Sequence, residues 1–168
     1  MVTLCDVASL NPSDVARVVV ALAYVGFAVV GSILIVIDLR SHRLPNRIVL
    51  PAIASAVALL FIAAVLGGDW AAFGGALLGG LTLGGFYLML RLIQPGGMGG
   101  GDMKLAVLVG VLLGWVGWMP LLVGTCAAFV LGAIAALSLI ATKRAKAATH
   151  IAFGPWMIAG AWIGLLLG

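Results

Sequence analysis

The sequence predicts an all-α membrane protein, a polytopic bundle of about six transmembrane helices that forms one domain over residues 1–168. The chain is 64% hydrophobic and only 8% charged, with a mean hydropathy of +1.30, whereas soluble domains carry roughly 25% charged residues. Its apolar residues form long runs, and its basic residues gather in the connections of one side. A chain this poor in charge cannot cover a water-facing surface, so membrane lipid must surround most of it.

Each predicted crossing is an apolar run of about 20 residues, the length that spans roughly 30 Å of hydrocarbon. Four runs fit one crossing each: residues 15–37, 48–66, 71–93 and 151–167. Residues 105–141 would extend about 55 Å as a single helix, which is too long. The stretch 114–120 contains Trp115, Trp118 and Pro120 and supplies a break with interfacial tryptophans. This run therefore predicts a fourth and a fifth helix.

The basic residues predict the orientation in the membrane. Six alternating crossings place residues 38–47, 94–104 and 142–150 on one side, and of the nine Lys and Arg residues only Arg17 lies on the other side. The positive-inside rule then predicts that the basic side faces the cytoplasm and that both termini face outward. Because this rule also accounts for the pI near 9.6, we expect no nucleic-acid partner. The basic residues on the predicted cytoplasmic side are Arg40, Arg43, Arg47, Arg91, Lys104, Lys143, Arg144 and Lys146.

Glycines recur at four-residue spacing in three of the predicted helices. Small residues at this spacing let helix backbones touch in lipid, so we assign these glycines a packing role and no chemistry. Such packing fits either the internal bundle or a homodimer, and the sequence leaves both open. The pairs are Gly75/Gly79, Gly80/Gly84, Gly110/Gly114 and Gly160/Gly164.

Two acidic residues, Asp38 and Asp102, lie on the predicted cytoplasmic side, and no other acid does. Asp38 ends the first helix, where a carboxylate opposes the helix dipole, so it either pairs with Arg40 or Arg43 or is functional. Asp102 follows glycines 99–101 at the start of a helix only about 24 Å long. It is either an N-cap or a group held below the membrane surface, where ionisable residues are costly and usually functional.

An aspartate pair in a partly dry site points to proteolysis. Two such carboxylates cannot both stay ionised, so they share a proton. The ionised member takes a proton from water while the protonated one polarises a peptide carbonyl, as in aspartic proteases. The chain has no Cys-x-x-Cys pair, so we expect no metal and no cofactor. His42 and His150 are interpreted as loop residues.

Two other classes of function remain open from these residues. Membrane carboxylates and glycine-broken helices also suit a small proton-coupled transporter that uses Asp38 and Asp102 as ion-pathway groups. Residues 15–93 and 102–167 show no convincing inverted repeat, which such carriers often have. The third interpretation is a purely structural membrane subunit.

Three motifs resemble the type IV prepilin peptidases. In that family an Asp at the cytoplasmic end of a helix is followed by Pro-Asn or Pro-Asp, as Asp38 is here by Pro45-Asn46. The second hallmark, Gly-x-Gly-Asp followed closely by Lys, matches residues 99–104, and a late Phe-Gly-Pro matches residues 153–155. The matches lie in the family's order and on the predicted cytoplasmic side.

The resemblance implies an aspartic endopeptidase of a bacterial or archaeal cell membrane that removes the basic leader of type IV pilin-like precursors. Its catalytic pair would be Asp38 and Asp102, acting at the cytoplasmic side. The chain lacks the four-cysteine insert of the larger, N-methylating family members, so a peptidase-only short form is implied. The residues expected to shape the site or bind substrate are Pro45, Asn46, Gly99, Gly101, Lys104, Gly154 and Pro155; for Lys104 a role as a topological anchor is equally open.

Overall fold

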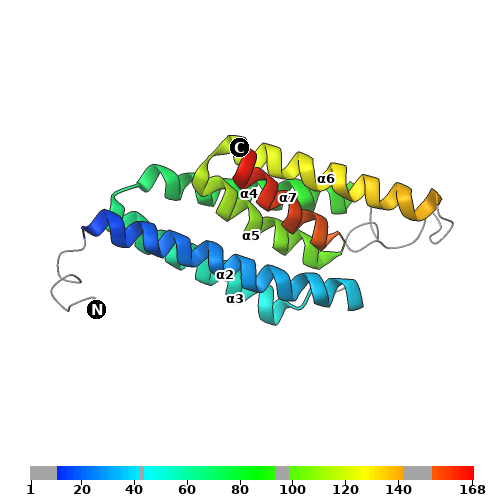
Figure 1. Ribbon diagram of the computed structural model, residues 1–168, viewed down its shortest axis with the longest axis horizontal. Coiled ribbons are helices and arrows are strands. Elements are labelled where there is room, and N and C mark those ends of the chain that lie inside the picture. The colour runs from blue at the N-terminus through cyan, green and yellow to red at the C-terminus, as the bar shows by residue number, and fades with distance from the viewer. Residues whose placement is uncertain (1–10, 42–43, 94–98, 142–152) are drawn as a thin grey trace.

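A computed structural model describes residues 11–41, 44–93, 99–141 and 153–168, which contain six helices and no strand. The helices form an elongated bundle (Figure 1). The C-terminal ends of α2, α4 and α6 and the N-terminal ends of α3, α5 and α7 gather at one end of it, on the right of Figure 1. The helices are α2 (Pro12–Ser41), α3 (Asn46–Gly67), α4 (Trp70–Ile93), α5 (Gly100–Val116), α6 (Trp118–Ala141) and α7 (Gly154–Leu167). This confirms the prediction of an all-α bundle.

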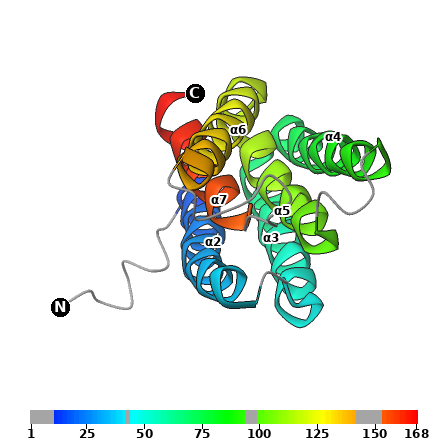
Figure 2. The same cartoon turned by 90° about the vertical axis from the view of Figure 1, so that its right-hand side faces the viewer.

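Four of the helices, α2, α3, α4 and α6, are long and apolar enough to cross a membrane. Many of their large apolar side chains are exposed, as expected of surfaces that face lipid. The two shorter helices, α5 with 17 residues and α7 with 14, lie in the middle of the bundle (Figure 2). Helix α5 packs against α3, α4, α6 and α7. The chain is therefore a multi-pass membrane protein with a short, enclosed central helix.

The predicted break within residues 105–141 is confirmed. Helix α5 ends at Val116 and α6 begins at Trp118. The residue between them, Gly117, has φ +150°, a conformation that L side chains rarely adopt and glycine tolerates. Its N–H donates a hydrogen bond to the Leu113 carbonyl, 3.0 Å away, which satisfies one of the last carbonyls of α5. Pro120 lies in the first turn of α6, where no intrahelical N–H partner is needed.

Glycines form the contact between α4 and α5 and between α6 and α7. A methyl group added to Gly79 would lie 2.9 Å from the Gly114 Cα, and one added to Gly164 would lie 2.8 Å from the Gly124 Cα. These distances leave no room for a side chain, so each pair of helices meets backbone to backbone. The predicted packing role of the glycine pairs is confirmed within the bundle, while the homodimer stays a prediction.

The first helix is longer than predicted, because it continues to Ser41 instead of ending at residue 37. Asp38 consequently lies inside the last turn of α2. The apolar run ends at its first charged residue, so the predicted helix ends there as well. A helix can continue past that residue when its polar side chains face solvent, as that of Arg40 does. Several residues interpreted from the sequence lie outside the described residues: His42, Arg43, Lys143, Arg144, Lys146 and His150.

The glycine contacts predict a position-dependent cost of adding one methyl group. Gly79→Ala should lower the free energy of unfolding by about 1–3 kcal/mol, the usual cost of overpacking, because the new methyl meets the α5 backbone. Thermal unfolding of the purified protein in detergent measures this. Gly74→Ala is the matched control, since this glycine lies on the same helix and has nothing within 4 Å of the added group. Equal midpoints for the two variants would contradict the close-contact account.

Candidate active site

Asp38 is held against the start of α7. Its side chain is only 4% exposed, and its Oδ2 accepts a hydrogen bond from the Gly154 N–H at 3.0 Å. The first N–H groups of a helix have no partner within the helix and favour negative charge. A methyl group on Gly154 would lie 2.7 Å from the same Oδ2. Glycine at this position therefore lets the carboxylate approach the helix backbone.

The local sequence explains why α7 begins at this place. Phe153 is its N-cap, and Pro155 lies in the first turn, where the missing proline N–H costs no hydrogen bond and the fixed φ suits a helix. The Gly154-Pro155 pair thus starts the helix and leaves the Gly154 N–H free to point at Asp38. Gly154 and Pro155, which the family resemblance implied as residues that shape the site, therefore lie at the helix start that contacts Asp38.

Asp102 lies in the first turn of α5 and is 9% exposed. Its Oδ2 accepts a hydrogen bond from the Gly99 N–H at 3.2 Å. The interpretation of Asp102 as the N-cap is wrong in its position, because Gly99 is the N-cap and Asp102 is the third helical residue. A carboxylate at that position reaches back to the N-cap N–H. The residue therefore combines a capping contact with burial inside the bundle.

The two aspartates lie close enough for the charge of one to act on the other. They come from helices far apart in the sequence, and α7 packs against both α2 and α5. Among the described residues, Asp38 and Asp102 are the charged side chains that are buried. Burial of two neighbouring carboxylates disfavours two full charges, so one shared proton is the arrangement of lowest cost.

Two more of the predicted site residues, Asn46 and Lys104, contact each other. The Lys104 Nζ donates a hydrogen bond to the Asn46 Oδ1 at 2.6 Å, which links the first turn of α3 to the second turn of α5. Pro45 is the extended N-cap of α3, and its carbonyl accepts hydrogen bonds from the first turn of that helix. Pro45 and Asn46 thus set where α3 starts relative to the turn that carries Asp102.

The glycines before Asp102 make room for protein atoms. A methyl group on Gly101 would lie 2.5 Å from the Leu44 Cβ, and one on Gly99 would lie 3.2 Å from the Asp102 carboxylate. The space beside Gly101 is thus occupied by the side chain of Leu44. Leu44 could not be singled out beforehand, because an isolated leucine in a loop has no periodic pattern around it.

Sequence reasoning also missed Tyr87 of α4, which is 1% exposed and within electrostatic range of Asp102. Arg91, one turn further along α4, has its guanidinium beside Gly100. The glycines of α4 and α5 are the sequence feature from which the positions of both residues could have been predicted. An antiparallel register that pairs those glycines also pairs the end of α4 with the start of α5.

Comparison with known proteins finds a family match over most of the chain. The model of the type IV leader peptidase family matches residues 25–137. The chain is similar to the prepilin leader peptidase/N-methyltransferases of Stutzerimonas stutzeri (32% identity over 139 residues) and Pseudomonas aeruginosa (32% over 133). These matches cover 79% of the chain but only 45% and 44% of the two relatives, so the chain spans less than half of their length. No solved structure matches the chain significantly.

Burial of the two carboxylates predicts that replacing one ionisable group by a neutral one stabilises the fold. Asp102→Asn should raise the free energy of unfolding by about 1 kcal/mol, because an Asn cannot place a second charge beside the buried Asp38 carboxylate. An Asn side chain retains an oxygen that can accept the Gly99 N–H. Thermal unfolding in detergent at neutral pH measures the change.

Asp69 provides a matched control for this substitution. Its exposed carboxylate also accepts a backbone N–H at the start of a helix, that of Ala72 at 3.0 Å. Asp69→Asn should leave the midpoint unchanged, since Asp and Asn cap helices about equally well. A lower midpoint for Asp102→Asn would show that the charge itself stabilises the bundle and would contradict the account.

Proposed function

The chain belongs to the type IV leader peptidase family, and we propose that it is a membrane aspartic endopeptidase that cuts the leader from type IV pilin-like precursors. The observation that carries the proposal is the pair of buried, mutually interacting carboxylates, Asp38 and Asp102. Both lie within the part of the chain that the family model matches. The names of the bacterial relatives supply the class of substrate, a prepilin.

The aspartate pair can cleave a peptide with water alone. The ionised carboxylate accepts a proton from a water molecule as the water oxygen attacks the scissile carbonyl carbon. The protonated carboxyl gives its proton to the carbonyl oxygen, which yields a neutral tetrahedral diol. When the C–N bond breaks, the first carboxyl protonates the leaving nitrogen, and the other carboxylate recovers a proton from the diol. The pair then holds one proton again and is ready for the next turnover.

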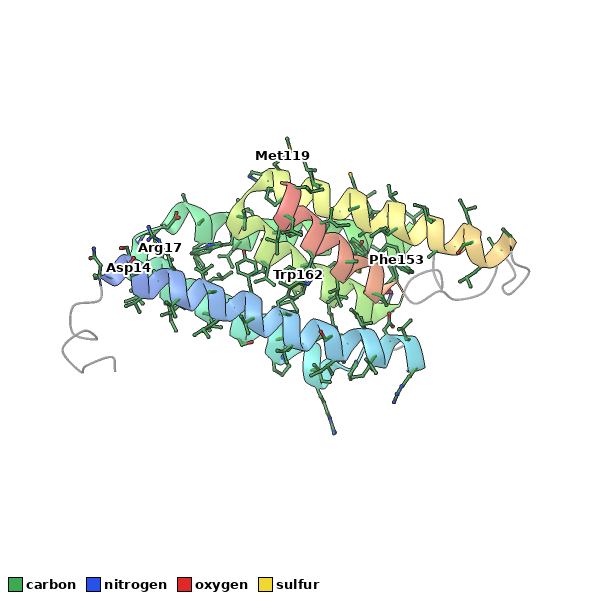
Figure 3. All side chains as sticks on the ribbon, in the orientation of Figure 1. Asp14, Arg17, Met119, Phe153 and Trp162 are labelled. Carbon is green, nitrogen blue, oxygen red and sulfur yellow. The ribbon has the colours of Figure 1, made fainter. Side chains whose placement is uncertain are left out.

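The proposed active face is the cytoplasmic one. Exposed Arg40, Arg47 and Arg91 lie at the end of the bundle that carries the two aspartates, and the positive-inside rule assigns such an end to the cytoplasm. The opposite end carries Asp14 and Arg17 (Figure 3). These two residues of the same helix form an ion pair, with 3.1 Å between the Arg17 Nη1 and the Asp14 Oδ1. Both termini would then face outward.

The family assignment favours a peptidase over the alternatives. A small proton-coupled transporter needs a route for ions past its carboxylates, whereas Asp38 and Asp102 both lie at one end of the bundle and accept hydrogen bonds from helix N-termini. A purely structural subunit gives no reason to bury two like charges. The arrangement suits a reaction at the membrane surface, where water and a substrate chain can reach the pair.

Removing either carboxylate should abolish cleavage. Asp38→Ala and Asp102→Ala are each expected to lower kcat/KM by at least about 10³-fold, because the two groups act as a unit. The measurement is conversion of a purified prepilin to its shorter form by the purified protein in detergent. Retained helical circular dichroism and an active Asp69→Ala variant serve as controls. Cleavage that persists in both aspartate variants would refute the proposal, and loss of activity with EDTA would point to a metal.

The contact between Gly154 and Asp38 predicts that one added methyl group at residue 154 slows cleavage. Gly154→Ala should lower kcat by about 10²-fold, because a displacement of about 1 Å of a reacting group can cost that much. The added methyl would lie 2.7 Å from the Asp38 Oδ2 and push the carboxylate aside. Gly85→Ala is the control, since the space beside that glycine is open. If Gly154→Ala retains wild-type kcat, the backbone of α7 does not position Asp38.

A further inference from the structure

The antiparallel contact between α4 and α5 places Tyr87 opposite the turn that carries Asp102. The two helices meet at closely packed glycines along their length, and this register continues to the end of α4. Tyr87 lies between the last two contacts, so it faces the first turn of α5. The successive contacts are Gly79 with Gly110, Gly84 with Val107, and Arg91 with Gly100.

The surroundings of Tyr87 connect it to both aspartates. Its ring lies 5.8 Å from the Phe129 ring and 6.2 Å from the Phe153 ring, centroid to centroid. Phe153 directly precedes Gly154, whose N–H binds Asp38. On its other side, Tyr87 lies within electrostatic range of Asp102. The phenol thus occupies the space between the α5 turn of one aspartate and the α7 turn that contacts the other.

Apolar packing explains the ring of Tyr87 but not its hydroxyl. A phenylalanine would fill the same aromatic cluster without placing a hydroxyl in it, and a hydroxyl in apolar surroundings is costly unless it is hydrogen-bonded. The second tyrosine of the chain shows how such a cost is met, because the Tyr24 hydroxyl donates to the Leu112 carbonyl at 2.8 Å. For Tyr87 the charged neighbour is the Asp102 carboxylate.

We propose that Tyr87 is a positioning residue of the peptidase site, whose hydroxyl donates a hydrogen bond to the Asp102 carboxyl during turnover and fixes its orientation. The inference rests on the proposed function. The register of α4 on α5 places Tyr87 opposite the turn that carries Asp102, and the described residues show no hydrogen bond between the two. In enzymes without substrate such bonds are often long and tighten only in the substrate complex. The hydroxyl acts through Asp102 and takes no proton in the reaction.

The test is a comparison of Tyr87→Phe with Tyr24→Phe in the full chain, using a purified prepilin as substrate. Tyr87→Phe should lower kcat tenfold or more, leave KM unchanged and leave the thermal midpoint unchanged or higher, because the ring and its packing are retained and an unbonded hydroxyl is removed. Tyr24→Phe should show the reverse, with a lower midpoint and an unchanged kcat, because its hydroxyl serves the fold.

Three outcomes would overturn the inference, and they are distinguishable from failure of the proposed function. An unchanged kcat in Tyr87→Phe, while Asp38→Ala and Asp102→Ala are inactive, removes the role of Tyr87 and leaves the peptidase intact. A lower midpoint in Tyr87→Phe with kcat unchanged assigns its hydroxyl to stability. A raised KM with kcat unchanged assigns it to substrate binding. If the wild-type protein cleaves no prepilin but binds it, the proposed function fails first.

Discussion

The enclosure of the short helix α5 is the constraint on which the rest of the structure depends. Its neighbours α4 and α6 have 24 residues each, whereas α5 has 17. A helix of that length rises about 25 Å, less than its neighbours, so its first turn ends inside the bundle. That turn carries Asp102. Asp38, on the longer helix α2, is buried at the same end because its side chain meets the start of α7.

Backbone groups at helix N-termini make the buried carboxylates tolerable. Asp102 accepts the N–H of Gly99, and Asp38 accepts the N–H of Gly154, so each charge meets one end of a helix dipole. These contacts offset part of the desolvation of the two groups. They also require glycine, because a side chain at residue 154 would occupy the position of the carboxylate. The site is therefore built largely from main-chain atoms at the starts of α5 and α7.

Much of this arrangement was predictable from the sequence because the chain has few charges. With five acids and a clear positive-inside pattern, Asp38 and Asp102 could be selected by position alone, and the glycine-rich break before Trp118 followed from length. What could not be predicted depends on register and side-chain packing. Hydropathy does not say that Leu44 fills the space beside Gly101, that Lys104 binds Asn46, or that Asp102 is the third residue of its helix. The contact of Gly154 with Asp38 needs the three-dimensional path of α7.

The position of α7 shows how a contact far from the aspartates can set their geometry. Helix α7 has only 14 residues, and its glycines 160 and 164 lie directly on the backbone of α6 near Gly124. Because Gly160 and Gly164 bring the two backbones into direct contact, α7 cannot slide along α6 without losing this packing. The start of α7, with Phe153 and Gly154, is connected to this glycine contact through the rigid helix. The glycines that hold α7 on α6 thus also determine where the Gly154 N–H meets Asp38, so packing and positioning of the site are the same structural feature.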